Sequence, residues 1–160
     1  MAAIEAGPLT VQMEGDFVVF LIGMRINNFL HVRRWWPVFR AMPGMIRELE
    51  ADPAHGLLHA RLHGGLRNFV LVQYWRSLDH LQRYAHNRDQ SHLPAWAAFN
   101  RAGGPNLSVG IWHETFIVRA GDYECIYAGM PPFGLGRAGP LIPAAGRLRT
   151  AKGRLDARAG

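Results

Sequence analysis

The chain has 160 residues, of which 49% are apolar and 19% charged. That length corresponds to about one domain, and the composition excludes disordered and collagen-like proteins. The longest apolar run, Phe17 to Met24, is far shorter than the ~20 residues of a membrane-spanning helix. Cys125 is the single cysteine, which excludes an internal disulfide, and no basic N-terminal signal precedes Arg25. We therefore expect a cytoplasmic domain without a membrane span.

The formal net charge of +6 is concentrated near the C-terminus. Residues 137–160 hold six basic residues and one acid, whereas residues 1–136 hold twelve basic and eleven acidic residues. A basic tail can attract nucleic acid or anionic lipid, or it can be a solvated end. Glycine, alanine and proline dominate this segment without any apolar period, which favours a disordered end. We expect no nucleic-acid partner, and we expect the fold to survive deletion of residues 138–160.

Strands and helices alternate between residues 15 and 136. Strands are predicted over residues 17–25, 57–63, 68–75 and 108–118, with a short fifth strand possible over residues 123–127. Helices are predicted over residues 31–51, 78–86 and 93–101. Pro43-Gly44 indicates a bend or break in the first helix, and Gly64-Gly65 is typical of a hairpin.

This order, βαββαβ, predicts a ferredoxin-like α+β fold, in which both helices cover one face of an antiparallel sheet. The chain would divide into an N-terminal extension (residues 1–14), a domain (residues 15–136) and the basic tail. Strands 17–25 and 68–75 are apolar on both faces, although the helices can cover only one. We therefore expect a homodimer that joins two open sheet faces into a dimeric α+β barrel, with a ligand pocket between sheet and helices.

Two patterns that resemble known sites are not favoured. His55, His59 and His63 recur every four residues, but on a strand that spacing separates them by ~13 Å, too far to share a metal ion. Gly134, Gly136 and Gly139 have the spacing of a dinucleotide-binding fingerprint, but their sequence context differs from that of the motif. Flanking prolines and the absence of a following βαβ unit indicate a glycine-rich loop.

Two histidines are stronger candidates for chemistry. His92, Trp96 and Phe99 share one face of the predicted helix 93–101, so His92 could ligate haem iron or carry a proton. His113 lies among apolar residues on one face of strand 108–118, while Trp112 and Glu114 share the opposite face. The alternative for both histidines is a hydrogen-bonded structural role.

Several strings resemble a monooxygenase-like family of unassigned function, some of whose fungal members are associated with terpenoid biosynthesis. They are Met24–Asn27, Trp36–Phe39, Gln73–Ser77, His92–Asn100, Gly110–Thr115 and Tyr123–Tyr127. The family is similar to the dimeric α+β barrel superfamily of antibiotic-biosynthesis monooxygenases. Some relatives in that superfamily oxygenate electron-rich substrates without a cofactor, and others bind haem through a histidine.

The resemblance implies a monooxygenase of secondary metabolism that acts on a small hydrophobic substrate, with haem as a candidate cofactor. The alternative is a non-catalytic dimeric module that binds haem or another small ligand. The expected catalytic residues are His92 and His113, with His92 as the candidate ligand of haem iron. The residues expected to line the pocket are Tyr74, Trp75, Arg76, Trp96, Asn100, Trp112 and Glu114.

Overall fold

A computed structural model describes residues 4, 7–86 and 108–158 of the chain. The strands are β1 (Leu9–Val11), β2 (Phe17–Ile26), β3 (Leu57–Gly64), β4 (Asn68–Trp75), β5 (Val109–Val118) and β6 (Leu141–Pro143). The α-helices are α1 (Val32–Ala51), α2 (Leu78–His86) and α4 (Ala151–Asp156). Single 3-10 turns are η1 (Pro53–His55), η2 (Gly134–Arg137) and η3 (Gly146–Arg149). The helix predicted over residues 93–101 lies outside the described residues.

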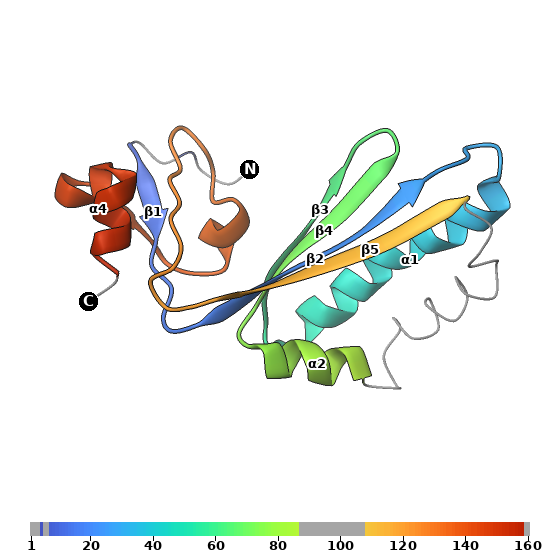
Figure 1. Ribbon diagram of the computed structural model, residues 1–160, viewed down its shortest axis with the longest axis horizontal. Helices are drawn as coiled ribbons and strands as arrows, with labels where there is room; N and C mark the ends of the chain where they lie inside the picture. The colour runs from blue at the N-terminus through green and yellow to red at the C-terminus, as the bar shows by residue number, and fades with distance from the viewer. Residues whose placement is uncertain (1–3, 5–6, 87–107, 159–160) are drawn as a thin grey trace.

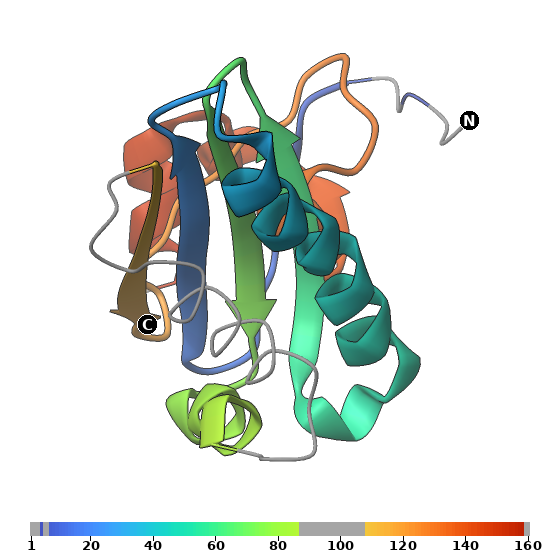
Figure 2. The ribbon, with the colours of Figure 1, turned by 90° about the vertical axis from the view of Figure 1, so that its right-hand side faces the viewer.

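The main sheet has the strand order β3-β4-β2-β5, and every neighbouring pair is antiparallel. With α1 between β2 and β3, and α2 after β4, this is the ferredoxin-like α+β arrangement that the sequence predicts. Figure 2 shows both helices on the same face of this sheet. Ile22 of β2 pairs with Leu71 of β4 and His113 of β5, so these three side chains lie on the same face of the sheet.

The helix α1 is continuous from Val32 to Ala51, so of the bend or break predicted at Pro43-Gly44, the break does not occur. Pro37 and Pro43 are both exposed, and the backbone groups that they leave without a helical partner can therefore be solvated. The helix ends at Asp52, whose carboxylate accepts a hydrogen bond from the Ala54 amide at 2.9 Å. Within the described ranges, no helix combines the length and the apolar character needed to cross a bilayer.

The helix-facing side of the sheet carries two apolar clusters. One is centred on Met24, Ile26 and Leu71 and packs against α1. The other joins Trp75 and Val18 to Leu81 and Tyr84 of α2 and to Leu49 at the end of α1. Neither α1 nor α2 crosses β5, which forms one edge of the sheet (Figure 2). Much of β5 is therefore uncovered by these two helices.

Residues 137–158 form regular structure, which differs from the disordered tail expected from the sequence. Strand β6 pairs with β1, and together with η2, η3 and α4 they make a small lobe at one end of the sheet (Figure 1). We call β1 with residues 119–158 the terminal lobe. Its apolar residues Val11, Tyr123 and Leu135 pack against Phe17 of β2 and Tyr74 of β4, so the lobe covers one end of the face opposite the helices.

Arginine side chains, rather than an apolar period, order the end of the terminal lobe. Arg154 is buried, forms an ion pair with Glu124 and donates to the Leu148 carbonyl at 2.7 Å. The Arg158 guanidinium lies 4.3 Å from the ring centre of Tyr123 and donates to Thr10 Oγ1 at 2.9 Å. Arg154 and Arg158, two of the basic residues that suggest a solvated tail, thus form contacts inside the terminal lobe.

Candidate functional site

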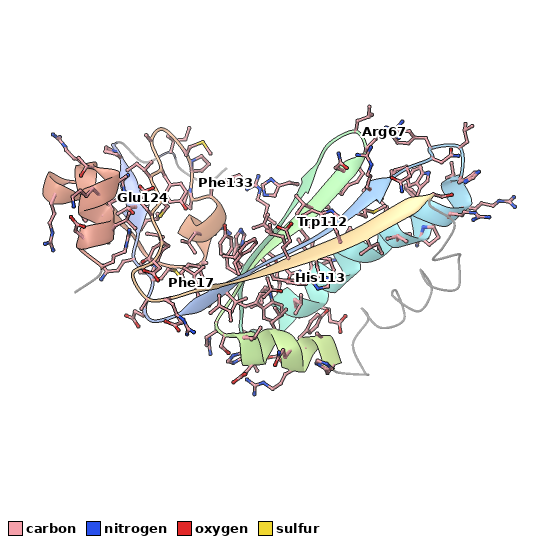
Figure 3. All side chains as sticks on the ribbon, viewed as in Figure 1. Phe17, Arg67, Trp112, His113, Glu124 and Phe133 are labelled. Carbon is pink, nitrogen blue, oxygen red and sulfur yellow. The ribbon has the colours of Figure 1, made fainter. Side chains whose placement is uncertain are left out.

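Strand β5 presents chemically different side chains on its two faces. His113, Thr115 and Ile117 face the helix side of the sheet, and Trp112, Glu114 and Phe116 face the open side. All six side chains are exposed, because β5 is an edge strand that α1 and α2 do not cover. Figure 3 shows the labelled Trp112 and His113 on this strand. Among the described residues, therefore, neither α1 nor α2 covers the surface that β5 borders on the helix side, and the terminal lobe covers only one end of the open side.

On the helix side, His113 lies where the two apolar clusters meet. Ile22, which pairs with His113 across the two strands, packs against the cluster that contains Met24. Phe20, whose ring lies beside the His113 ring, packs against the cluster that contains Trp75. The His113 and Phe20 ring centres are 5.8 Å apart, with the planes tilted by 43°. An exposed imidazole bordered by apolar side chains can exchange a proton with a hydrophobic ligand placed beside it.

Trp75 and Arg76, two of the predicted pocket residues, do not reach this surface. Trp75 is fully buried in the core, and its indole Nε1 donates to Gln73 Oε1 at 2.8 Å. The Arg76 side chain is exposed after the end of β4, and its backbone amide donates to the Gly56 carbonyl at 2.9 Å. Trp75 is therefore placed to stabilise the fold.

Three other predicted pocket residues lie on the opposite, open face: Tyr74, Trp112 and Glu114. The Trp112 indole lies over Gly23, since a Cβ built on that glycine would be only 2.6 Å from the ring. Tyr74 is half-buried beneath the terminal lobe and packs with Leu135. Because His113 faces the helices, these three residues cannot share one pocket with it. The remaining candidates, His92, Trp96 and Asn100, lie outside the described residues.

The sequence did not single out the contact between β3 and the terminal lobe. His59 pairs with Tyr74 across neighbouring strands, and their rings are parallel within 8° at a centroid distance of 6.5 Å. His59 Nε2 is buried without a hydrogen-bond partner. Burial lowers the pKa of His59, and the nearby Arg137 charge lowers it further. A register shift between Leu57 and His59 places His59 opposite Tyr74, and no local pattern predicts this shift or the approach of residues 134–137 to β3.

The described residues contain no cluster of three or more histidine, cysteine or acidic side chains that could hold a metal ion. His55 lies in η1, outside the strand that carries His59 and His63. The three histidines therefore do not lie on one strand, which differs from the arrangement expected from their spacing.

The strand order and the two helices on one face define the class, a ferredoxin-like α+β domain. Residues 17–135 match the family described as Monooxygenase af470-like, and the chain belongs to that family. A relative, Monooxygenase af470 of Aspergillus fumigatus, is 31% identical over 134 residues, which are 78% of this chain. The chain spans 46% of that relative, about half of its length.

Two solved structures illustrate the similarity in chain trace. SnoaB, a cofactor-independent oxygenase from Streptomyces nogalater, gives a TM-score of 0.47 at 15% identity, over 65% of this chain and 94% of that one. A dimeric protein of unknown function and ferredoxin-like fold from Bacteroides fragilis gives 0.42 at 16% identity, over 62% of this chain and 96% of that one. The fold assignment rests on the strand order described above.

Proposed function

We propose that this domain is a monooxygenase that acts on a small hydrophobic substrate bound on the helix-facing side of β5. The observation that carries the proposal is the exposed His113 imidazole at the junction of two apolar clusters. Membership of the Monooxygenase af470-like family supports the reaction class. His113 is the proposed proton-transfer residue, and Phe20 and Ile22 are the proposed apolar contacts of the substrate.

The reaction that suits this surface is oxidation of an acidic methylene group to a carbonyl. The imidazole of His113 removes one proton from the methylene, and the carbanion reduces and binds O₂ to give a peroxide at that carbon. The remaining proton of that carbon passes to the terminal peroxide oxygen as the O–O bond breaks, so that one oxygen stays as the carbonyl and the other leaves as hydroxide. The imidazolium returns its proton to the hydroxide, so that CH₂ and O₂ become C=O and H₂O without an external reductant.

Residues 87–107 hold the predicted partners of this site. His92, Trp96 and Asn100 remain proposals from the sequence, with Trp96 and Asn100 as pocket residues and His92 as an alternative proton-transfer group. The alternative to a reaction without a cofactor is a reaction that uses haem. The described residues do not make up a haem site, because the proposed ligand His92 lies outside them and the His113 ring packs against Phe20. No step of the reaction above therefore involves haem.

The open face supports a second part of the proposal, a homodimer. The terminal lobe covers only one end of this face. Trp112 and Phe116 beyond it are 38% and 50% exposed, which is unusual for large aromatic side chains on a sheet. A second copy of the chain that packs its own open face against these residues would cover the open faces of both sheets. Trp112 and Glu114 are then proposed as dimer contacts rather than substrate contacts.

The test uses the purified full chain and a series of anthrones, whose methylene group is acidic. The expected result is oxygen uptake, with one atom of labelled O₂ incorporated in each product molecule and with no added reductant or haem. Absorption spectra before and after haem addition distinguish the alternatives. A Soret band that appears on titration, without oxygen uptake across the series, would favour the non-catalytic haem-binding module and overturn the proposal.

A further inference from the structure

Large apolar side chains are exposed at the end of the sheet that lies away from the terminal lobe. Leu30 in the β2–α1 loop is 90% exposed, and Leu66 in the β3–β4 hairpin is 84% exposed. Val32 and Trp36, in the first turns of α1, are 49% and 48% exposed. We call these four residues, with Arg25, Arg33, Arg34, Arg40 and Arg67, the distal tip.

Direct contacts hold the two loops of the distal tip together. Arg67 of the hairpin lies 4.6 Å from the ring centre of Phe29 and donates to the backbone carbonyls of Ile26 and Asn27, each at 3.2 Å. Figure 3 shows the labelled Arg67 at the top of the hairpin, close to the β2–α1 loop. The exposed leucines therefore belong to one continuous end of the molecule.

The charge of this end is of a single sign. Residues 17–47 contain five arginines and residues 53–78 contain three, and neither stretch contains an aspartate or glutamate. Among the described residues, the ion pairs involve Asp16, Asp52, Glu124 and Asp156, and none includes a residue of the distal tip. The distal tip thus offers cationic groups that nothing else in the described chain neutralises.

We infer that the distal tip docks on the surface of an anionic lipid bilayer. Arginines attract acidic headgroups, while tryptophan and leucine side chains insert at the boundary of headgroups and acyl chains. Nucleic acid would satisfy the arginines but would leave the almost fully exposed Leu30 and Leu66 in water. Docking would place the domain where hydrophobic molecules dissolve, and the inference does not depend on the oxygenase proposal.

The test is co-sedimentation of the full chain with vesicles of phosphatidylcholine, with and without phosphatidylserine. Strong binding is expected only with phosphatidylserine, and it should weaken as salt screens the arginines. The double substitution Leu30→Ser with Leu66→Ser should lower the partition coefficient at least tenfold, since both leucines lose their insertion energy. The double substitution Arg33→Gln with Arg40→Gln should lower it by roughly tenfold or more, at ~1 kcal/mol for each charge near the surface.

The terminal lobe provides matched controls. Ile126 and Leu155 are 45% and 41% exposed there, and Arg147 and Arg149 are exposed as well. Substituting both apolar residues by serine, or both arginines by glutamine, should leave vesicle binding within about twofold of the wild type. Equal loss in the lobe and tip variants, or no binding to phosphatidylserine vesicles, would overturn the inference. Binding to duplex DNA but not to vesicles would overturn it in favour of nucleic acid.

Discussion

The two faces of the main sheet are covered in different ways. On one face, α1 and α2 directly follow their strands along the chain and pack through apolar clusters. On the other, one end of the sheet is covered by the terminal lobe, which joins parts of the chain as distant as Thr10 and Cys125. Local periodicity thus determines the first face, whereas long-range contacts, several of them with arginine, determine the second. The edge strand β5 has exposed side chains on both faces, and the proposed substrate site and dimer contacts lie on this strand.

Removing the buried arginine of the lobe should have the largest effect on stability. Arg154→Ala leaves Glu124 without its cation and two backbone carbonyls without a donor. Loss of a buried pair costs about 3 kcal/mol, and chemical denaturation measures it. The control is Lys152→Ala, which removes an exposed pair with Asp156 in the same helix and should cost less than about 0.5 kcal/mol. Equal costs would mean that the lobe is not held by Arg154.

The open face should also be sensitive at Gly23. A Cβ there would lie 2.6 Å from the Trp112 ring and 2.7 Å from the Phe69 carbonyl oxygen. Since the carbonyl belongs to the backbone of β4, Gly23→Ala should destabilise the fold by about 1–3 kcal/mol. Gly110→Ala is the matched control, because its Cβ would meet nothing nearer than 3.8 Å. Similar melting temperatures for the two variants would contradict the placement of Trp112.

Charge on the open face should separate the proposed dimer without unfolding the domain. Trp112→Glu with Phe116→Glu places two carboxylates where a second copy would pack. The expected result by light scattering is a fall in mass from twice 17.9 kDa to one chain, with unchanged circular dichroism. Thr115→Glu with Ile117→Glu is the control, since it adds the same charge on the helix-facing side. A monomeric wild type at micromolar concentration would rule out this dimer.

A smaller effect is expected from pH at His59. Burial lowers the pKa of His59 below the ordinary value of 6.5, so the unfolded chain takes up this proton at a higher pH than the folded chain. Stability should therefore fall as the pH decreases below about 6.5 and level off below the folded pKa. His59→Phe should remove part of this slope, measured as unfolding free energy against pH. A wild-type slope in the variant would mean that His59 does not contribute.

The sequence predicts the helix-facing half of the molecule well because that half is built from local patterns. Strand β4 and helix α2 have the predicted bounds, and the alternation along β5 places His113 and Trp112 on the expected faces. It does not predict the terminal lobe, because β1 and β6 have three residues each and are too short to show a period. Nor can it divide the candidate pocket residues between the two faces without knowing which strands are neighbours.

The most direct test of the proposed site compares two adjacent residues of β5 that point in opposite directions. His113→Ala and Glu114→Ala both change exposed side chains, so both should alter stability by less than about 0.5 kcal/mol. With an anthrone that supports oxygen uptake by the wild type, His113→Ala should lower kcat at least a hundredfold, because the proton acceptor is lost. Glu114→Ala should retain most of the activity. Equal rates for the two variants, or loss of activity only in Glu114→Ala, would contradict a site on the helix-facing side of the sheet.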